Sequence, residues 1–290
     1  MQTIDLETWE QFEEELKTRN ITIGDKYLFR GHENSSWSLD TTLERRGLRG
    51  IPFADYYRLI SVIRAQIETF TSTAWGELPQ YPEIANLAQE YDKFSLMLDG
   101  IGGTFPAYSY MAYLRHHGFP SPLLDWSRTP YVAAYFAFRN ATKERVAVYV
   151  YLERPGGMKS WSSAETQIHL LGPYIQTHRR HFLQQSTYTI CLDFQIGQGW
   201  NFAPHEGVFS RNVQHQDVLW KFTIPATERV KVLKKLDSYN LNAFSLFESE
   251  EALMETMAFR HIDFKRAVSA PLQDGPEESR LKEVPHDDEP

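Results

Sequence analysis

Hydrophobic positions follow a helical period in several stretches of the chain. Between residues 6 and 18, Leu6, Trp9, Phe12 and Leu16 recur every three or four positions with acidic residues between them, which predicts an amphipathic helix. The same period runs from Asp55 to Trp75 over about five turns. Comparable patterns predict further helices over residues 83–98, 106–116, 128–138 and 226–236, and after Ser249.

Other segments are rich in β-branched and aromatic residues, as buried strands are, and Val146 to Leu152 is the clearest of them. Phe244 to Phe247 is interpreted as a short strand or turn. The remaining predicted strands lie near Phe29, Trp37, Leu123, Thr189 and Lys221. These segments predict an α+β fold with a mixed or antiparallel central sheet and a helical lobe over about residues 55–116. We expect residues 1–266 to form a single domain.

Composition and charge narrow the class of protein. The 290 residues are 42% hydrophobic and 14% aromatic, which suffices for a sizeable core. A net charge of -8 argues against binding a phosphate backbone through bulk charge. Residues 267–290 are acidic and rich in proline, so we expect a disordered tail. The chain lacks a secretory start and a long apolar run, which favours a cytoplasmic location and no membrane partner.

One arginine stands out among the candidate functional residues. The apolar run Tyr27-Leu28-Phe29 leads into Arg30, so a permanent charge is expected at the end of a buried strand. A buried guanidinium needs either an internal carboxylate or an anionic ligand, and both remain open. Asp125 is the best candidate in the sequence for the carboxylate that balances Arg30, although a helix-capping role alone would explain an aspartate at this position. The basic loop of Arg45, Arg46 and Arg49 is interpreted as solvated.

The sequence gives little support for a metal site or for a reactive cysteine. His116 and His117 have the right donor atoms for a metal, but no third ligand follows at a useful spacing. Cys191 is the only cysteine, and it lies in an apolar segment where a buried strand residue is expected. We therefore predict no metal site and no disulfide.

Several motifs together resemble the FRG domain family, which is named for a Phe-Arg-Gly motif. The resemblance rests on segments in matching order from Leu6 to Ile262. Its motifs are Phe29-Arg30-Gly31, Trp37-Ser38-Leu39, Arg115-His116-His117-Gly118-Phe119-Pro120, Leu123-Leu124-Asp125-Trp126-Ser127, a later segment with Arg180, Gln184, Tyr188 and Thr189, and a closing run from Lys221 through Phe247 to Glu251.

A weaker resemblance to the Arg-Ser-Glu class of ADP-ribosyltransferases implies a fold of that type and an activity. It implies NAD as substrate, with Arg30 holding phosphate or ribose and Glu251 or Glu250 stabilising an oxocarbenium-like transition state. Tyr188 would stack on nicotinamide. The other residues assigned to NAD binding are Gly31, His116, Asp125, Trp126, Ser127, Gln184 and Ser186.

This resemblance implies a transferase or NAD glycohydrolase of the toxin or anti-phage defence type. Such an enzyme would act on an unknown protein or nucleic-acid acceptor and would have a regulatory or antitoxin partner. The alternative is a non-catalytic module that binds a nucleotide, a nucleic acid or a protein, with Arg30, Asp125 and Trp126 in a structural network. Convergence of Arg30, Tyr188 and Glu251 on one pocket would favour the enzyme. A hydrolase using His116 or His117 lacks a nucleophile-elbow motif.

Overall fold

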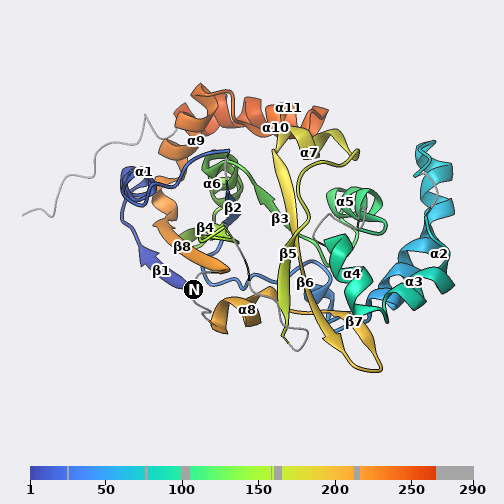
Figure 1. Ribbon diagram of the computed structural model, residues 1–290. Coiled ribbons are helices and arrows are strands. Elements are labelled where there is room, and N and C mark those ends of the chain that lie inside the picture. Colours follow the sequence, from blue (N-terminus) through green and yellow to red (C-terminus); the bar gives the residue numbers. More distant parts are fainter. Residues whose placement is uncertain are drawn as a thin grey trace, which may run out of the picture.

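The computed structural model describes residues 1–24, 26–75, 78–98, 105–157, 159, 165–211 and 216–265. A twisted sheet forms its centre, and helices surround it (Figure 1). Along the sheet the strand order is β1-β8-β4-β2-β3-β6-β5, and β7 also pairs with β6. The strands are β1 (Gln2–Asp5), β2 (Tyr27–His32), β3 (Leu124–Ser127), β4 (Arg145–Leu152), β5 (Gln167–Leu170), β6 (Ser186–Gln195), β7 (Gly199–Phe202) and β8 (Val218–Pro225).

The sheet is mixed, as predicted. β1 runs parallel to β8, and the other strand pairs are antiparallel. The prediction of a strand at Trp37 was wrong, because this residue lies in a loop after β2. Three short strands had no clear sequence signal, namely β1, β5 and β7. Each has four residues and gains its hydrogen bonds from a longer neighbour, which local propensity cannot reveal.

The helices are α1 (Trp9–Thr18), α2 (Phe53–Thr71), α3 (Tyr81–Leu87), α4 (Tyr91–Leu98), α5 (Tyr108–His116), α6 (Pro130–Phe138), α7 (Arg179–Leu183), α8 (His205–Arg211), α9 (Arg229–Ser238), α10 (Ala243–Phe247) and α11 (Glu250–Ala258). Helices α2 to α5 form a lobe to one side of the sheet (Figure 1). The predicted helix over 83–98 is two helices. The predicted strand or turn at Phe244 is helix α10, which Asn242 caps by accepting from the Ser245 backbone N–H.

Helix α6 packs tightly on strand β2 and fixes one side of the site described below. α6 is apolar all round, as a helix buried on every side must be. It crosses β2 at Gly31, where a Cβ atom would lie 1.9 Å from the Ala133 carbonyl oxygen and 2.6 Å from the Ala137 nitrogen. Only glycine permits this approach. Phe29, on the same side of β2, is fully buried in the core with α1 and α9.

Strands β2 and β3 pair at one position only, Phe29 with Ser127. Beyond it the two strands separate, while β2 stays paired with β4 along its whole length and β3 stays paired with β6. This opening in the sheet gives side chains from both strands access to solvent. Within the described ranges, no helix combines the length and apolar character needed to cross a membrane.

Candidate functional site

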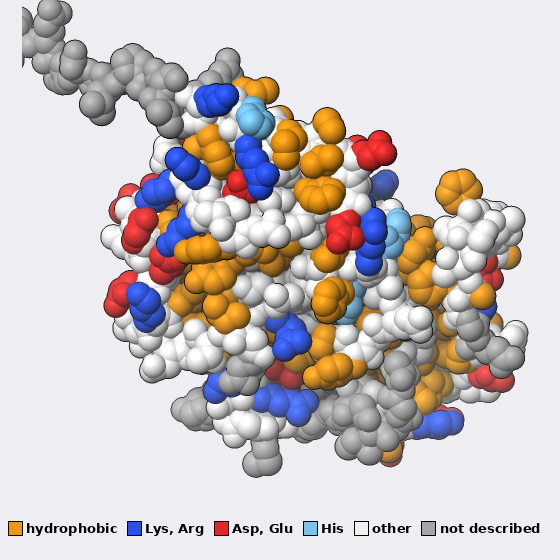
Figure 2. Space-filling model, turned by 90° about the horizontal axis from the view of Figure 1, so that it is seen from above, with side chains coloured by type: hydrophobic (Ala, Val, Ile, Leu, Met, Phe, Trp, Pro, Cys, Tyr) orange, Lys and Arg blue, Asp and Glu red, His pale blue; other side chains and the backbone are white. Residues whose placement is uncertain are grey.

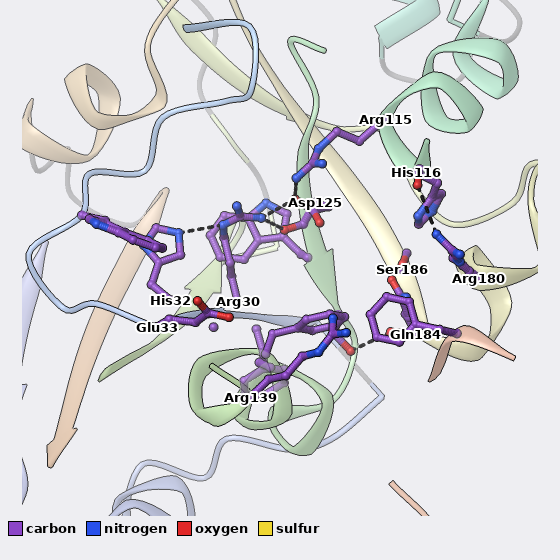
Figure 3. A pocket seen from close by; sticks show the side chains of 18 of the residues that line it. Arg30, His32, Glu33, Arg115, His116, Asp125, Arg139, Arg180, Gln184 and Ser186 are labelled. Atoms are coloured by element: carbon purple, nitrogen blue, oxygen red, sulfur yellow. Dashed lines mark hydrogen bonds and ion pairs between the residues drawn. The ribbon is translucent and has the colours of Figure 1, made fainter. Parts of the chain in front are cut away.

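A cavity of about 380 Å³ opens where β2 and β3 separate. Its lining comes from the strands β2, β3 and β6, from helices α5, α6, α7 and α10, and from the loop after β2 (Figure 3). The polar lining residues are Arg30, His32, Glu33, Arg45, Arg115, His116, Asp125, Ser127, Arg139, Arg180, Gln184 and Ser186, and the apolar ones include Phe29, Trp37, Trp126, Phe136 and Phe247.

Asp125 lies between two arginines at the base of the opening. The Arg30 guanidinium donates to the Asp125 carbonyl oxygen at 2.6 Å and forms an ion pair with its carboxylate. Arg115 Nη2 donates to the same carboxylate oxygen at 2.8 Å. Burial alone would raise the pKa of Asp125, but Arg115 and Arg30 outweigh it and hold this pKa well below its usual range. Asp125 is therefore ionised at neutral pH.

Positive charge exceeds negative charge in the cavity. Five arginines and two carboxylates, those of Glu33 and Asp125, line it. Arg139 is satisfied by a bidentate contact with Glu255, at 2.7 and 2.5 Å. Arg45 and Arg180 form no ion pair with a carboxylate in the described part of the chain. Burial lowers the pKa of Arg45, and the neighbouring charges of Arg30 and Arg115 lower it further, which shows that the guanidinium groups repel one another.

Three buried donor groups of residues at the cavity have no hydrogen-bond partner among the residues that the structure describes. They are Nε of Arg115, Nε of Arg180 and Nδ1 of His32. His32 accepts a hydrogen bond from Arg30 Nε at its other ring nitrogen, and burial holds its pKa well below the usual value. The neutral ring therefore carries its proton on Nδ1. Unsatisfied buried donors are costly in free energy, and these three belong to residues that line the cavity.

The structure brings most of the predicted site residues together. Arg30, Gly31, His116, Asp125, Trp126, Ser127, Gln184 and Ser186 all line the cavity, although they come from segments up to about 150 positions apart. In Figure 3 the Arg30 and Arg115 side chains point toward Asp125, and His116 lies beside Arg180. Arg30 has the internal carboxylate partner that was one of its two interpretations, because it pairs with Asp125. Arg30 also lines the cavity, and its contact with an anionic ligand stays a prediction.

Three predicted residues do not line the cavity. Tyr188 is fully buried, with its ring stacked on His181 at 5.7 Å and its hydroxyl close to His116, so it has no free face for nicotinamide. Glu250 and Glu251 are exposed in the first turn of α11, where Ser249 caps the helix. The Ser249 hydroxyl lowers the pKa of Glu251. These carboxylates act at the helix N-terminus, where negative charge is favourable.

Sequence reasoning missed several lining residues. Arg45 was assigned to a solvated loop, and the Gly-punctuated basic segment gave no sign of pointing inward. Arg139 follows α6 and Phe247 ends α10, and neither stood out in sequence. Trp37 lines the cavity while remaining 46% exposed. Among the described residues, no group of three or more histidine, cysteine, aspartate or glutamate side chains is placed to hold a metal ion.

Comparison with known protein families gives a match over part of the chain. Residues 25–146 match the family model of the FRG domain. The chain therefore contains an FRG domain, and the match covers the Phe29-Arg30-Gly31, Arg115 to Pro120 and Leu123 to Ser127 motifs. It ends before the segment with Arg180 and Gln184, so the cavity is completed by residues beyond the matched region. No curated protein and no solved structure matches the chain.

Proposed function

We propose that the cavity binds a phosphorylated nucleotide and that NAD is the leading candidate. The observation that carries this proposal is the excess of arginine over carboxylate, with Arg45 and Arg180 lacking carboxylate partners in the described ranges. Guanidinium groups bind phosphate oxygens through paired, charge-assisted hydrogen bonds. A bound phosphate would offset the repulsion among the arginines around Asp125.

The apolar lining suits the other parts of a nucleotide. Trp37 presents an exposed ring at the cavity, and Phe136 and Phe247 contribute further aromatic surface. Bases stack on aromatic side chains, and such contacts are tolerant of base identity. The volume of about 380 Å³ is within the range of small-molecule sites. The combination of arginines and aromatic rings favours a nucleotide over a simple inorganic anion.

Cleavage of NAD is the finer version of this proposal. An NAD glycohydrolase or ADP-ribosyltransferase needs a carboxylate near the bond between nicotinamide and ribose. Glu250 and Glu251 lie outside the cavity, so the carboxylates available for that role are Asp125 and Glu33. Asp125 is ionised but shared between two arginines, which weakens its field at a developing cation. We therefore place binding first, and a toxin or anti-phage role depends on cleavage.

The test is calorimetric titration of the purified chain with NAD and with ADP-ribose. We expect saturable binding of both, and about tenfold weaker binding in Arg45→Gln because one charge-assisted contact is lost. Arg49→Gln is the matched control, since Arg49 is in the same loop but pairs with Asp40 at 3.0 Å outside the cavity. The control should bind like the wild type.

The same samples decide between binding and cleavage. Release of nicotinamide from NAD, followed by chromatography, would establish the enzyme, and Asp125→Asn and Glu33→Gln would identify the carboxylate. Binding without release would establish a nucleotide-binding module. Absence of binding for both ligands, with folding verified by circular dichroism, would contradict the proposed function.

A further inference from the structure

Behind the cavity wall, a chain of hydrogen bonds connects His116 to the interior. His116 ends α5 and lines the cavity, and its Nε2 atom is 2.6 Å from the Tyr188 hydroxyl. That hydroxyl is 3.3 Å from Nδ1 of His181, and Nε2 of His181 is 2.9 Å from the Pro173 carbonyl oxygen. Tyr188 and His181 are buried and do not line the cavity, so the chain runs from the site into the protein.

The protons of this chain can be assigned by counting donors and acceptors. A carbonyl oxygen only accepts, so Nε2 of His181 carries a proton. Burial lowers the pKa of His181, and the ring is neutral, which leaves Nδ1 as an acceptor. The nearest donor to that nitrogen is the single hydroxyl proton of Tyr188. The Tyr188 oxygen must then accept from His116, whose Nε2 therefore carries the proton. If the Tyr188 hydroxyl donated to His116 instead, the unprotonated Nδ1 of His181 would face a lone pair of the Tyr188 oxygen.

The surroundings of His116 keep its ring neutral as well. Burial lowers its pKa to about 3 against the attraction of Asp125, and Arg115, His181 and His178 contribute in the same direction as burial. A neutral ring with its proton on Nε2 has an unprotonated Nδ1. Because Nε2 is occupied by Tyr188, Nδ1 is the ring nitrogen left for a ligand.

We propose that Tyr188 and His181 are positioning residues that fix the tautomer of His116, so that Nδ1 of His116 accepts a hydrogen bond from a hydroxyl or amide N–H group of the ligand. This inference rests on the proposed nucleotide binding and assigns a second kind of recognition to the same cavity. The arginines bind phosphate oxygens, and His116 selects ligands that carry a neutral donor. Ribose hydroxyls and the nicotinamide carboxamide are such neutral donors, whereas pyrophosphate has neither a sugar hydroxyl nor an amide N–H group.

The first measurement is the ¹⁵N spectrum of the histidine side chains in the ligand-free protein. We expect His116 to show a protonated Nε2 and an unprotonated Nδ1. In His181→Phe the Tyr188 hydroxyl loses the acceptor Nδ1 of His181 and can donate to Nε2 of His116, so the His116 tautomer should shift toward a protonated Nδ1 although every cavity-lining atom is retained. Tyr188→Phe, a second variant, should show a mixture of both tautomers.

The second measurement compares the affinities for ADP-ribose and for pyrophosphate. We expect His181→Phe to bind ADP-ribose about tenfold more weakly and pyrophosphate within about twofold of the wild type, because one hydrogen bond to a donor group is lost. Tyr188→Phe should bind ADP-ribose only about twofold more weakly, because about half of its His116 rings keep an unprotonated Nδ1. Tyr108→Phe is the matched control. Tyr108 is a buried tyrosine whose ring lies 5.9 Å from that of Tyr188, but its hydroxyl donates to the Gly172 carbonyl. It should leave the tautomer and both affinities unchanged.

A comparison with NAD then identifies the donor. Equal losses for NAD and ADP-ribose in His181→Phe assign the contact to a ribose hydroxyl, and a loss for NAD alone assigns it to the carboxamide. A wild-type His116 protonated on Nδ1, or a loss for NAD no larger than that for pyrophosphate, would overturn the inference. If the wild type binds no nucleotide but shows the expected tautomer, the proposed function fails and the ligand contact with it, while the proton assignment stands.

Discussion

The two faces of strand β2 require different kinds of residue. On the side of α6, Phe29 is fully buried and Gly31 lies against the helix backbone with no space for another atom. On the alternate positions, Arg30 and His32 face the cavity and carry charge or unsatisfied hydrogen-bonding capacity. One face is closely packed against α6, and the other face carries polar side chains whose hydrogen bonds are not all formed within the described residues. The Phe-Arg-Gly motif therefore combines two structural residues with one functional candidate.

A second cluster of ion pairs has equal numbers of positive and negative side chains and can be compared with the cavity. Lys159 contacts Asp217 at 2.7 Å and Glu153 at 3.7 Å, and Arg154 contacts Glu153 at 3.2 Å. The Tyr151 hydroxyl also donates to Asp217. Two cations meet two carboxylates there, whereas the five arginines of the cavity meet three carboxylates once Glu255, the partner of Arg139, is counted with Glu33 and Asp125. We expect a network that serves only stability to balance its charges, so the imbalance at the cavity supports the proposal of an anionic ligand.

The largest effect is expected from filling the space at Gly31. In Gly31→Ala the new Cβ would overlap the Ala133 carbonyl, so α6 must move away from β2. We expect the free energy of unfolding to fall by about 3 kcal/mol or more, measured by chemical denaturation. Gly207→Ala in α8 is the control, because no atom lies within 4 Å of its added Cβ. A Gly31→Ala protein as stable as this control would contradict the closed packing of that face.

A smaller loss is expected from Asp125→Asn on the opposite face. The change leaves Arg30 and Arg115 facing each other without a counter-ion, and we expect a loss of about 2 kcal/mol at pH 7, less than for a fully buried pair because the Asp125 side chain is 35% exposed. The surface change Asp40→Asn should cost about 1 kcal/mol or less.

The pH dependence of this effect has a definite sign. The folded-state pKa of Asp125 lies below its unfolded value of about 4, so its contribution is present above that value and is lost as the pH falls through the folded pKa. Wild-type stability should therefore fall between about pH 5 and pH 2, and the Asp125→Asn variant should fall less over this window. Parallel curves for the two proteins would show that Asp125 is not held ionised by the arginines.

The smallest effect is expected from an added anion. Pyrophosphate should raise the melting temperature of the wild type by a few degrees, since a ligand that binds only the folded state stabilises it. Arg45→Gln should reduce this rise, and Arg49→Gln should not. Equal rises in all three proteins would indicate an unspecific salt effect and would remove the distinction between the two faces of β2.

Net charge and composition do not report where charged side chains gather in the folded protein. On the face over α9 to α11, Figure 2 shows basic, acidic and hydrophobic side chains interspersed, in a chain with a net charge of -8. The overall charge argued against binding a phosphate backbone through bulk charge and left a locally basic face open, and one cavity collects five arginines. Charge counted along a chain does not report how side chains converge in space, so the local excess became visible only in the structure.

The longer elements followed from sequence because their patterns are local. The amphipathic period of α1 and α2 and the β-branched run of β4 predicted them within a few residues. The short strands β1, β5 and β7 and the helix at Phe244 depend on partners distant in sequence, and they were missed or misassigned. For the candidate site, the motifs identified Arg30, Asp125 and His116 because their residue types and positions are unusual for a strand end or a turn.

The sequence by itself determined that the chain is an α+β protein with an FRG domain and that Arg30 requires a negatively charged partner. The tertiary structure alone decided that this partner is Asp125, that Arg45 and Arg180 join the same cavity, and that Tyr188 and Glu251 do not. The physical reason is that residue type sets what chemistry a side chain can perform, whereas strand separation and helix packing set which side chains meet. Only the folded chain brings together residues that lie up to about 200 positions apart.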